Sequence, residues 1–430
     1  MNKPTRSPWT WVPTLYFAEG LPYVMVMTVS VIMYKRFGLS NTEIALYTSW
    51  LYLPWVIKPF WSPFVDILKT KRWWIIAMQL LIGGGLAGVA LTLPTPFYLQ
   101  ASLAFFWLLA FSSATHDIAA DGFYMLALDD SQQSFFVGIR STFYRLAMIT
   151  GQGLLIILAG FLEQSTGKIS LSWSITFFVL SGLFVAFFAY HNFILPYPAG
   201  DVERKDQTPK KILAEFVNTF ASFFSKKGII LAIAFMFLYR LAEAMLVKLA
   251  SPFLLDAREE GGLALSTQEV GLVYGTVGVI ALTIGGIIGG IVASQKGLKF
   301  WLWPMALAIT LPNVAYVFLS MTQPDNIWWV NVAVAIEQFG YGFGFTAYML
   351  YLIYFSEGEH KTAYYSICTG FMALGMMLPG MAAGWIQEQL GYQHFFIFIM
   401  ICTIPTLLLV PFMKIDPEFG KKKIKDKTRN

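Results

Sequence analysis

Residues 39–44 read LSNTEI, and 226 positions later residues 265–270 read LSTQEV. Two further pairs recur at an offset of 224 positions: Ala18-Glu19 with Ala242-Glu243, and AGFL at 159–162 with AGWI at 383–386. One such match would occur by chance, but three at nearly one offset indicate an internal duplication. The chain is therefore expected to contain two similar halves.

The composition places these halves in a membrane. Of the 430 residues, 57% are hydrophobic and 13% are charged, and mean hydropathy is +0.60, whereas soluble domains carry about a quarter charged residues. A chain so poor in charge cannot cover a globular surface, so most of its surface must face lipid. The net charge of +5 is then no sign of a nucleic-acid partner. Cys368 and Cys402 lie in apolar runs, so no disulfide framework, metal site or cofactor is predicted.

Stretches of about 20 apolar residues mark membrane spans. Twelve are found, at roughly 11–34, 43–65, 73–93, 97–127, 134–162, 171–195, 229–254, 268–293, 298–319, 328–355, 362–386 and 392–413. The first 10 residues contain no separate cleavable signal, so the first helix is expected to stay as an anchor. The expected fold is an all-α membrane protein with 12 transmembrane helices in two six-helix halves.

The domains expected from this pattern are an N-terminal half at 1–195, a cytoplasmic linker at 196–228, a C-terminal half at 229–413 and a basic tail at 414–430. Apolar residues at helical spacing in 212–224 predict an amphipathic helix along the inner membrane surface.

The positions of Lys and Arg predict the orientation. If the N-terminus is cytoplasmic, 21 of the 30 basic residues fall in inner segments, 4 fall outside and 5 lie within spans. Cytoplasmic loops hold Lys and Arg preferentially, so both termini are predicted to lie in the cytoplasm. Parallel six-helix halves that bind solute between them near midplane are the architecture of major facilitator transporters.

The loop after the second span resembles a pattern of that superfamily, Gly-x-x-x-Asp followed by basic residues and Gly. Here SPFVD at 62–66 precedes Lys69, Lys71 and Arg72, so the Asp and the cations are present while the glycines are missing. The resemblance implies that Asp66 caps a neighbouring helix and latches an inner gate with Lys71 and Arg72. A positive-inside loop with an incidental Asp is the alternative.

The fourth span contains charges that hydrocarbon normally excludes. Its segment SATHDIAADG at 113–122 carries Asp117, Asp121 and His116. Because the two aspartates are four residues apart, a helix places them on one face, where they can share a proton, a cation or a basic partner. A water-filled pathway is the default interpretation.

This segment resembles the Ala-Thr-Gln-Asp-Ile-Ala-x-Asp signature of AmpG-type muropeptide permeases and their relatives, the acetyl-CoA transporters. The stretches FAEGLP at 17–22, KPFWSP at 58–63 and GWIQEQLGY at 384–392 are also similar to that family. The resemblance implies a carrier of the bacterial inner membrane that imports anhydro-muropeptides, which are sugar-peptide fragments of cell-wall turnover, in symport with protons. His116 stands where the family more often has Gln.

Proton coupling is assigned to Asp117 and Asp121. Desolvation raises the pKa of a carboxyl group, whereas a neighbouring guanidinium lowers it. The protonation of such a group can therefore change as the cavity switches sides. His116 is a further candidate because a free imidazole titrates near neutrality, although a hydrogen-bonded histidine packed against a helix is an equal alternative. Glu19 is flanked by Gly20 and Pro22, which loosen the first helix, and it is expected to line the pathway.

The solute is expected to meet charged and aromatic groups. Arg145 either holds a solute carboxylate or neutralises an aspartate, and it is preferred over Arg140, which lies nearer the inner end, where its side chain can snorkel. Snorkelling is also the preferred interpretation of Lys58. The predicted solute-binding residues are Arg145, Arg140, Tyr144, Tyr23, Gln152, Tyr239, Arg240, Glu243, Glu337 and Gln338.

Two of these groups have structural alternatives. Arg240 and Glu243 are three residues apart and can form an internal ion pair, although Glu243 is the repeat counterpart of Glu19 and should face the same cavity. Glu337 and Gln338 lie beside a glycine run, for which close packing is favoured over gating.

Other functions are less well supported by the residues. No metal-ligand spacing, nucleophile elbow or phosphate loop points to an enzyme. A carrier for another solute, such as acetyl-CoA, a peptide or a sugar, and a non-transporting receptor remain alternatives. The expected partners are a small solute, protons and the lipid bilayer, with the chain acting as a monomer.

Overall fold

The computed structural model describes residues 6–202, 209–358 and 360–421, and within them every regular element is helical. The first half comprises η1 (Pro8–Thr10), α1 (Val12–Val24), η2 (Met25–Val29), α2 (Ser30–Arg36), α3 (Asn41–Trp50), α4 (Leu53–Leu68), α5 (Lys71–Thr92), α6 (Tyr98–Ala127), α7 (Asp130–Ile149), η3 (Thr150–Leu154), α8 (Leu155–Thr166) and α9 (Ile169–Ile194).

The second half follows helix α10 (Pro209–Phe224). It comprises α11 (Ile229–Leu238), α12 (Leu241–Leu255), η4 (Arg258–Glu260), α13 (Thr267–Val270), η5 (Gly271–Gly278), α14 (Val279–Lys296), α15 (Leu298–Thr310), η6 (Leu311–Asn313), α16 (Val314–Thr322), α17 (Ile327–Phe355), α18 (Lys361–Cys402), α19 (Ile404–Leu409) and η7 (Val410–Phe412).

These elements join into the twelve predicted spans. Nine helical segments in the described chain are long and apolar enough to cross a membrane, and one of them, Lys361–Phe412, holds two spans. Gly391 divides it with a left-handed φ of 72°, which glycine adopts without strain. The two other spans are the α3–α4 pair and α17. The predicted fold class is confirmed, while the domain boundaries stay predictions.

Several spans are bent or broken where the sequence predicted one continuous helix. The second is interrupted at Leu51 and Tyr52, just before Pro54 in the first turn of α4. The seventh is interrupted at Tyr239 and Arg240. Three others contain the π-helical turns η2, η3 and η5. Such turns are frequent at functional sites because they change which side chains face inward.

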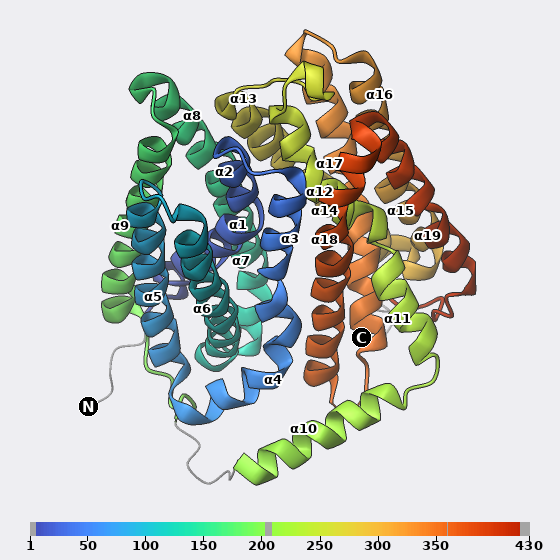
Figure 1. The fold of residues 1–430 in the computed structure, drawn as a ribbon. Coiled ribbons are helices and arrows are strands. Elements are labelled where there is room, and N and C mark those ends of the chain that lie inside the picture. The colour runs from blue at the N-terminus through green and yellow to red at the C-terminus, as the bar shows by residue number, and fades with distance from the viewer. Residues whose placement is uncertain (1–5, 203–208, 359, 422–430) are drawn as a thin grey trace.

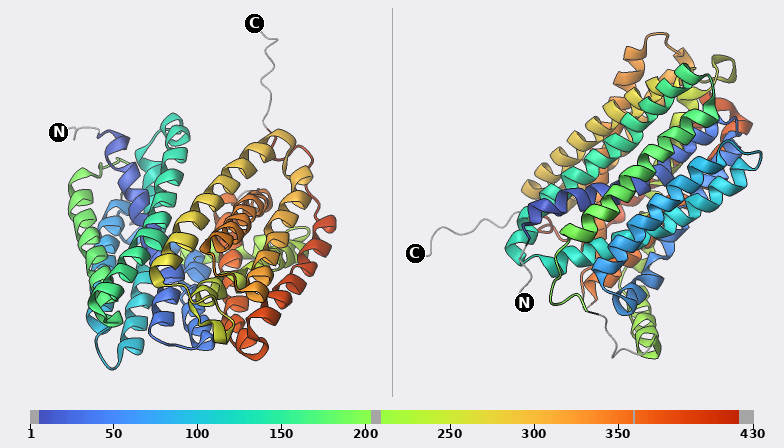
Figure 2. Two further views of the ribbon diagram at one scale, coloured as in Figure 1. Left: turned by 90° about the horizontal axis from the view of Figure 1, so that it is seen from above. Right: turned by 90° about the vertical axis from the view of Figure 1, so that its left-hand side faces the viewer.

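The two halves form separate helical bundles that lie side by side (Figures 1 and 2). Inside the halves, α5 packs against α6 and α9, and α14 packs against α17. A Cβ added at Gly285 would lie 2.2 Å from the Phe339 carbonyl oxygen, and one at Gly342 would lie 2.0 Å from that of Leu282. Such contacts favour close packing as the role of the glycine run in α17.

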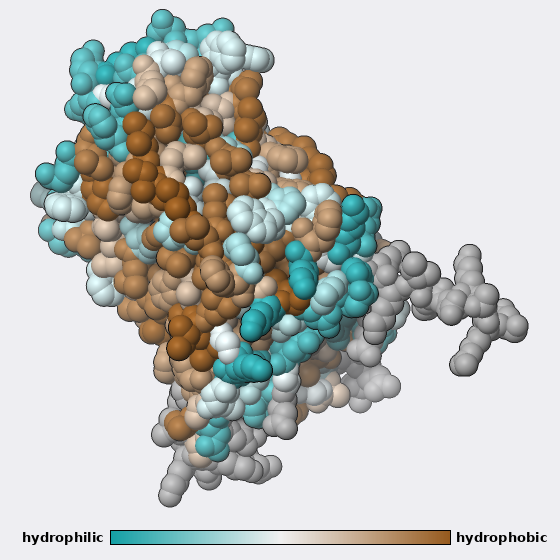
Figure 3. Space-filling model, turned by 90° about the vertical axis from the view of Figure 1, so that its right-hand side faces the viewer, coloured by the Kyte–Doolittle hydropathy of each residue, from teal (hydrophilic) through white to brown (hydrophobic). Residues whose placement is uncertain are grey.

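The outer surface has the polarity expected of a membrane protein. On the face shown in Figure 3, apolar side chains form a broad central band, with hydrophilic residues gathered toward its two ends. Ile230, Leu408 and Phe412 are among the exposed apolar side chains of the protein. Lipid can accept such a band, whereas a soluble monomer seldom exposes apolar patches of this kind.

Helix α10 lies across one end of the molecule, where it crosses beneath the second half (Figure 1). It occupies the position at which the sequence predicted an amphipathic helix. Its Phe223 is fully buried against Phe355 and Tyr364, and the Ser222 and Tyr364 hydroxyls are 2.8 Å apart. The side that carries α10 is called the α10 end below, and the other side the opposite end.

Candidate functional site

A cavity of about 520 Å³ lies between the two halves. Its lining includes Lys69, Lys71, Asp201 and Thr362, which lie at helix ends or in the connection near the α10 end. Deeper positions come from both halves: Tyr23, Tyr52, Trp55, Lys58, Asp117 and Asp121 from the first, and Arg240, Tyr365, Ser366 and Thr369 from the second. The cavity therefore opens toward the α10 end.

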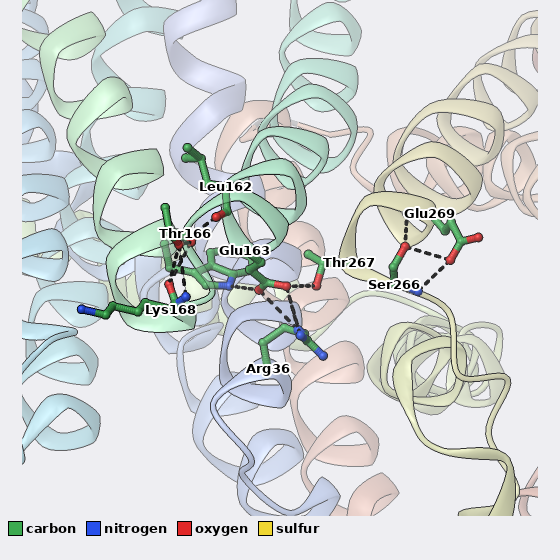
Figure 4. A network of polar contacts seen from close by, with 10 residues as sticks. Arg36, Leu162, Glu163, Thr166, Lys168, Ser266, Thr267 and Glu269 are labelled. Atoms are coloured by element: carbon green, nitrogen blue, oxygen red, sulfur yellow. Dashed lines mark hydrogen bonds and ion pairs between the residues drawn. The ribbon is translucent and has the colours of Figure 1, made fainter.

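The opposite end is closed by polar contacts between the halves (Figure 4). Glu163 in α8 accepts a hydrogen bond from Thr267 Oγ1 at 2.8 Å and pairs with Arg36 Nη2 at 3.1 Å. Asn41 Nδ2 donates to Gln387 Oε1 at 2.7 Å. In the duplication, Asn41 is the counterpart of Thr267, and Glu163 is the counterpart of Gln387. The same contact is thus made twice, with the halves exchanged.

Two glycines allow this closure. A Cβ added at Gly384 would lie 2.0 Å from the Asn41 carbonyl oxygen and 2.7 Å from Thr42 Cα. One added at its counterpart, Gly160, would lie 2.5 Å from Gln268 N. In each case, therefore, the first turn of a helix from one half packs directly on a glycine of the other half. The duplicated stretches that indicated the fold, LSNTEI with LSTQEV and AGFL with AGWI, build this end of the molecule.

The helices that insert there begin with the same local structure. Ser40 accepts a hydrogen bond from Glu43 N, and the Glu43 side chain accepts one from Ser40 N. Ser266 and Glu269 form the same reciprocal capping box at the start of α13 (Figure 4). Capping satisfies backbone donors that would otherwise be exposed at a helix start, so these ends can pack against the other half.

The two aspartates of the fourth span each have a cation from a different helix. Lys58 Nζ in α4 pairs with Asp117 Oδ2. Arg140 Nη2 in α7 lies 2.5 Å from Asp121 Oδ1, and its guanidinium lies 4.2 Å from the centre of the Tyr16 ring. The expectation that Lys58 and Arg140 snorkel to the surface is wrong, because their ion pairs hold both inside the bundle.

Glu19 adds a third carboxylate to this group. It is 7% exposed, its Oε2 atom has no hydrogen-bond partner among the described residues, and it interacts electrostatically with both aspartates and both cations. Three carboxylates therefore face two cations here. With all five groups charged, one negative charge would be uncompensated.

His116 faces away from the two aspartate pairs. Its Nε2 atom lies 3.0 Å from Gln79 Nε2, Gln79 Oε1 lies 2.9 Å from His191 Nδ1, and His191 Nε2 lies 2.9 Å from Thr14 Oγ1. This buried chain joins α6, α5, α9 and α1. The geometry favours the structural interpretation of His116, and its titration stays untested.

Arg145 does not pair with the aspartates. Its Nη1 donates to the Thr283 carbonyl oxygen at 3.1 Å, across the contact between α7 and α14. Of the two roles predicted for Arg145, neutralising an aspartate is not seen in this conformation, because Arg140 pairs with Asp121; holding a solute carboxylate stays a prediction. The two residues are five apart in one helix, so sequence alone could not show which one turns inward.

Arg240 brings positive charge to the cavity from the second half. It is 6% exposed, its Nη2 donates to Tyr341 OH at 2.5 Å, and its guanidinium lies 4.8 Å from the centre of the Phe345 ring. Among the described residues no carboxylate lies within ion-pair distance of Arg240, and its Nε atom has no hydrogen-bond partner. The direct pair with Glu243 considered from the sequence is not formed.

Glu243 and Glu337 lie behind this wall. They are 2% and 1% exposed. Glu337 accepts hydrogen bonds from its neighbour, Gln338 Nε2, at 3.0 and 3.3 Å. Neither carboxyl oxygen of Glu243 has a hydrogen-bond partner among the described residues. Glu243 is thus the repeat counterpart of Glu19, and neither Glu243 nor Glu337 lines the cavity.

Of the four remaining predicted solute-binding residues, one lines the cavity and three are packed inside the bundle. Tyr23 lines the cavity. The Tyr239 hydroxyl donates to the Gly344 carbonyl oxygen at 2.9 Å, and Tyr144 packs against Gly20. Gln152 is buried in η3. In the conformation described, the latter three contribute to packing.

At the predicted inner gate, which stays a prediction, the structure places a residue that sequence reasoning missed. Asp201, from the connection after α9, accepts hydrogen bonds from Lys71 N at 2.7 Å and Arg72 N at 3.0 Å, so it caps α5. Arg72 also donates to the Leu195 and Asn192 carbonyl oxygens. The side chain of Asp66 lies outside the part of the structure that is described. Asp201 has no sequence signal, because its partner is 130 residues away.

Comparison with known proteins agrees with this architecture. Residues 14–356 match the Major Facilitator Superfamily, and the chain belongs to that superfamily. The fold and the family together define a secondary transporter of the membrane.

Individual relatives cover nearly the whole chain. A protein of Rickettsia conorii, named as a candidate transporter, AmpG 4, is 27% identical over 422 residues, which are 93% of this chain and 94% of the relative. The anhydromuropeptide permease of Escherichia coli K12 is 25% identical over 409 residues, 92% of this chain and 77% of the relative. The resemblance noted in the sequence is confirmed.

Solved structures share the fold. A D-xylose-proton symporter superposes with a TM-score of 0.73 at 13% identity, covering 96% of this chain and 98% of its own. The inward-facing, unoccupied structure of a bacterial homologue of the human lysosomal transporter Spinster gives a TM-score of 0.68 at 15% identity, covering 95% and 96%. At these identities the likeness concerns the fold alone.

Proposed function

We propose that this protein imports anhydro-muropeptides across a bacterial inner membrane by proton-driven alternating access. The observation that carries the proposal is the cavity between the halves, whose walls bring Lys58, Asp117 and Arg240 together. The permease name of the Escherichia coli relative supports the choice of solute.

The chemistry of the walls supports a solute that combines sugar rings with a peptide. Tyr23, Tyr52 and Trp55 offer ring surfaces against which sugar faces can pack. Arg240 can hold a carboxylate through charge-assisted hydrogen bonds. The cavity is of the size of small-molecule sites, about 300–1,000 Å³, and a longer solute extends through its opening.

The orientation follows from the charge distribution. Lys69, Lys71, Arg72, Lys226 and Lys227 gather near the α10 end, and basic residues favour the cytoplasmic side. With the α10 end inside, both termini are cytoplasmic and the conformation is inward-facing. The cavity lies within one chain, which supports a monomer as the transporting unit.

Proton coupling is assigned to the cluster of Glu19, Asp117 and Asp121. A buried charge without compensation is costly, so the third carboxylate favours a bound proton. When the cavity opens to the cytoplasm and water reaches the cluster, the proton can leave. The direction of the proton gradient then sets the direction of solute movement.

The test is uptake of labelled anhydro-muropeptide into sealed right-side-out vesicles under an imposed pH gradient. We expect accumulation of the unchanged solute, loss of accumulation when a protonophore collapses the gradient, and a weaker dependence on the gradient in Glu19→Gln and Asp117→Asn/Asp121→Asn variants. Chemical conversion of the solute would instead indicate an enzyme, and binding without accumulation would indicate a receptor. Either result contradicts the proposal.

A further inference from the structure

The second half contains two buried carboxylates that the proposed transport cycle does not use. Glu243 in α12 is 2% exposed and Glu337 in α17 is 1% exposed, and the two interact electrostatically with each other. Both oxygens of Glu243 lack a hydrogen-bond partner among the described residues. An ionised carboxylate in that condition is strongly disfavoured, because desolvation costs several kcal/mol by general estimates.

Among the residues that the structure describes, one charged group of opposite sign interacts with this acid pair. The titratable side chains that interact electrostatically with Glu243 or Glu337 are Arg240 just before α12, Tyr274 in η5, Tyr316 in α16 and Tyr341 in α17. Lys248, a buried cation within α12, points to the first half, where it donates to Thr48 Oγ1 at 2.9 Å. Arg240 therefore acts directly on Glu243, and Glu337 is linked to it through Glu243.

Arg240 connects this acid pair to the solute cavity. It lines the cavity from the position just before α12, whereas Glu243, three residues further along the chain, lies behind it. Its contacts with Tyr341 and Phe345 hold the guanidinium in place without neutralising it. A negative group that enters the cavity and binds Arg240 therefore competes with Glu243 for the same positive charge, and Glu337 senses the change through Glu243.

We infer that Glu243 and Glu337 form a second proton-binding site, whose occupancy is coupled through Arg240 to the binding of a solute carboxylate. This inference rests on the proposed function for the identity of the solute. Without solute, one proton on the pair balances two carboxylates against Arg240. When a solute carboxylate binds Arg240, a second proton restores neutrality. By linkage, proton binding tightens solute binding by the same factor.

A proton suits this site better than a metal cation. The guanidinium is permanently charged and would repel a metal ion placed beside it. A proton needs no ligand shell and can bind to a single carboxylate oxygen. Protons should therefore drive the step, and a sodium gradient should not replace them.

The first test is the level of accumulation in vesicles at a fixed pH gradient of one unit. Each coupled proton multiplies the limiting accumulation ratio by about tenfold per pH unit. We expect the double variant Glu243→Gln/Glu337→Gln to accumulate about tenfold less than the wild type, while solute exchange without a gradient persists. The matched control is Glu259→Gln/Glu260→Gln, which removes the same charge from exposed positions and should accumulate as the wild type does.

The second test needs no solute. Infrared difference spectra of the purified full chain should contain a protonated carboxylic acid band that the double variant loses and the control variant keeps. Unchanged accumulation in a double variant that exchanges solute, accumulation driven by sodium, or an unchanged band would each overturn the inference. If the wild type itself fails to accumulate the muropeptide, the proposed function fails, and the infrared band still decides whether the pair holds a proton.

Discussion

Lys58 and Asp117 show how a single residue pair defines one wall of the cavity. They come from α4 and α6, and their side chains are 21% and 24% exposed, so water reaches them only from the cavity. In this setting the attraction between the two charges mainly offsets the free-energy cost of removing each of them from water. Removing one partner strands the other in a poorly solvated position.

We expect Lys58→Met and Asp117→Asn each to reduce transport by more than tenfold and to destabilise the protein by about 1–3 kcal/mol. In the double variant no stranded charge remains, so its loss of stability should be smaller than the sum of the single losses. Thermal unfolding of the purified proteins, compared as a double-mutant cycle, measures this difference. If the losses of stability in the two single variants add up to that of the double variant, Lys58 and Asp117 do not stabilise each other.

The sequence predicted which residues of the fourth span matter but not what they touch. The spacing of Asp117 and Asp121 placed both on one face of a helix, and the structure agrees. Their partners, Lys58 and Arg140, come from other helices, and choosing between Arg140 and Arg145 requires the rotation of α7. The spacing of apolar residues does not determine how a helix is rotated about its axis when both of its faces contact apolar surroundings, either protein or lipid.

At the scale of elements, the contact between α3 and α18 controls the closed end. The helix start at Asn41 and Thr42 packs directly on Gly384, with room for a hydrogen atom and no side chain. A larger residue would push the two helices apart at the point where the halves meet. Loss of this contact should favour the conformation in which that end is open.

We expect Gly384→Ala to reduce transport at least tenfold and to open the cavity at the opposite end. A Ser49→Cys substitution in a background lacking Cys368 and Cys402 reports this exposure, because Ser49 is fully buried in α3. An impermeant thiol reagent should label Cys at this position faster in the Gly384→Ala variant. The matched control is Gly84→Ala, since no atom lies within 4 Å of a Cβ added there.

Equal labelling of the Gly384→Ala and Gly84→Ala proteins would contradict this role of the helix contact.

Sequence reasoning located α3 and α18 within a few residues. It did not detect the breaks at Leu51 and Tyr239 or the π-helical turns, because each changes the helix over only a few residues. Apolar composition is insensitive to such local changes.

On the scale of the whole molecule, the halves behave as two bodies joined by one connection. Asp201 fastens that connection to the first half by capping α5, and Lys226 fastens its other end by donating to the Phe355 and Glu357 carbonyl oxygens. Most other contacts between the halves lie at the opposite end or along the cavity walls. Covalent continuity should therefore not be required for assembly.

We expect co-expressed fragments 1–202 and 209–430 to assemble and to restore at least about a tenth of wild-type uptake, whereas neither fragment alone transports. Co-purification through a tag on one fragment measures assembly, and vesicle uptake measures function. The control is a split within α14, which divides the second bundle itself. Equal recovery from both splits would contradict the two-body description.

The exchanged contacts at the closed end, Asn41 with Gln387 and Thr267 with Glu163, have the symmetry of an isologous dimer interface, in which each surface meets the counterpart of itself. One polypeptide thus contains what two identical subunits would otherwise supply. Because each contact is present twice, a substitution on one side leaves its twin intact. The two copies have nevertheless diverged in chemistry, because an amide pairs with an amide in one contact and a hydroxyl with a carboxylate in the other.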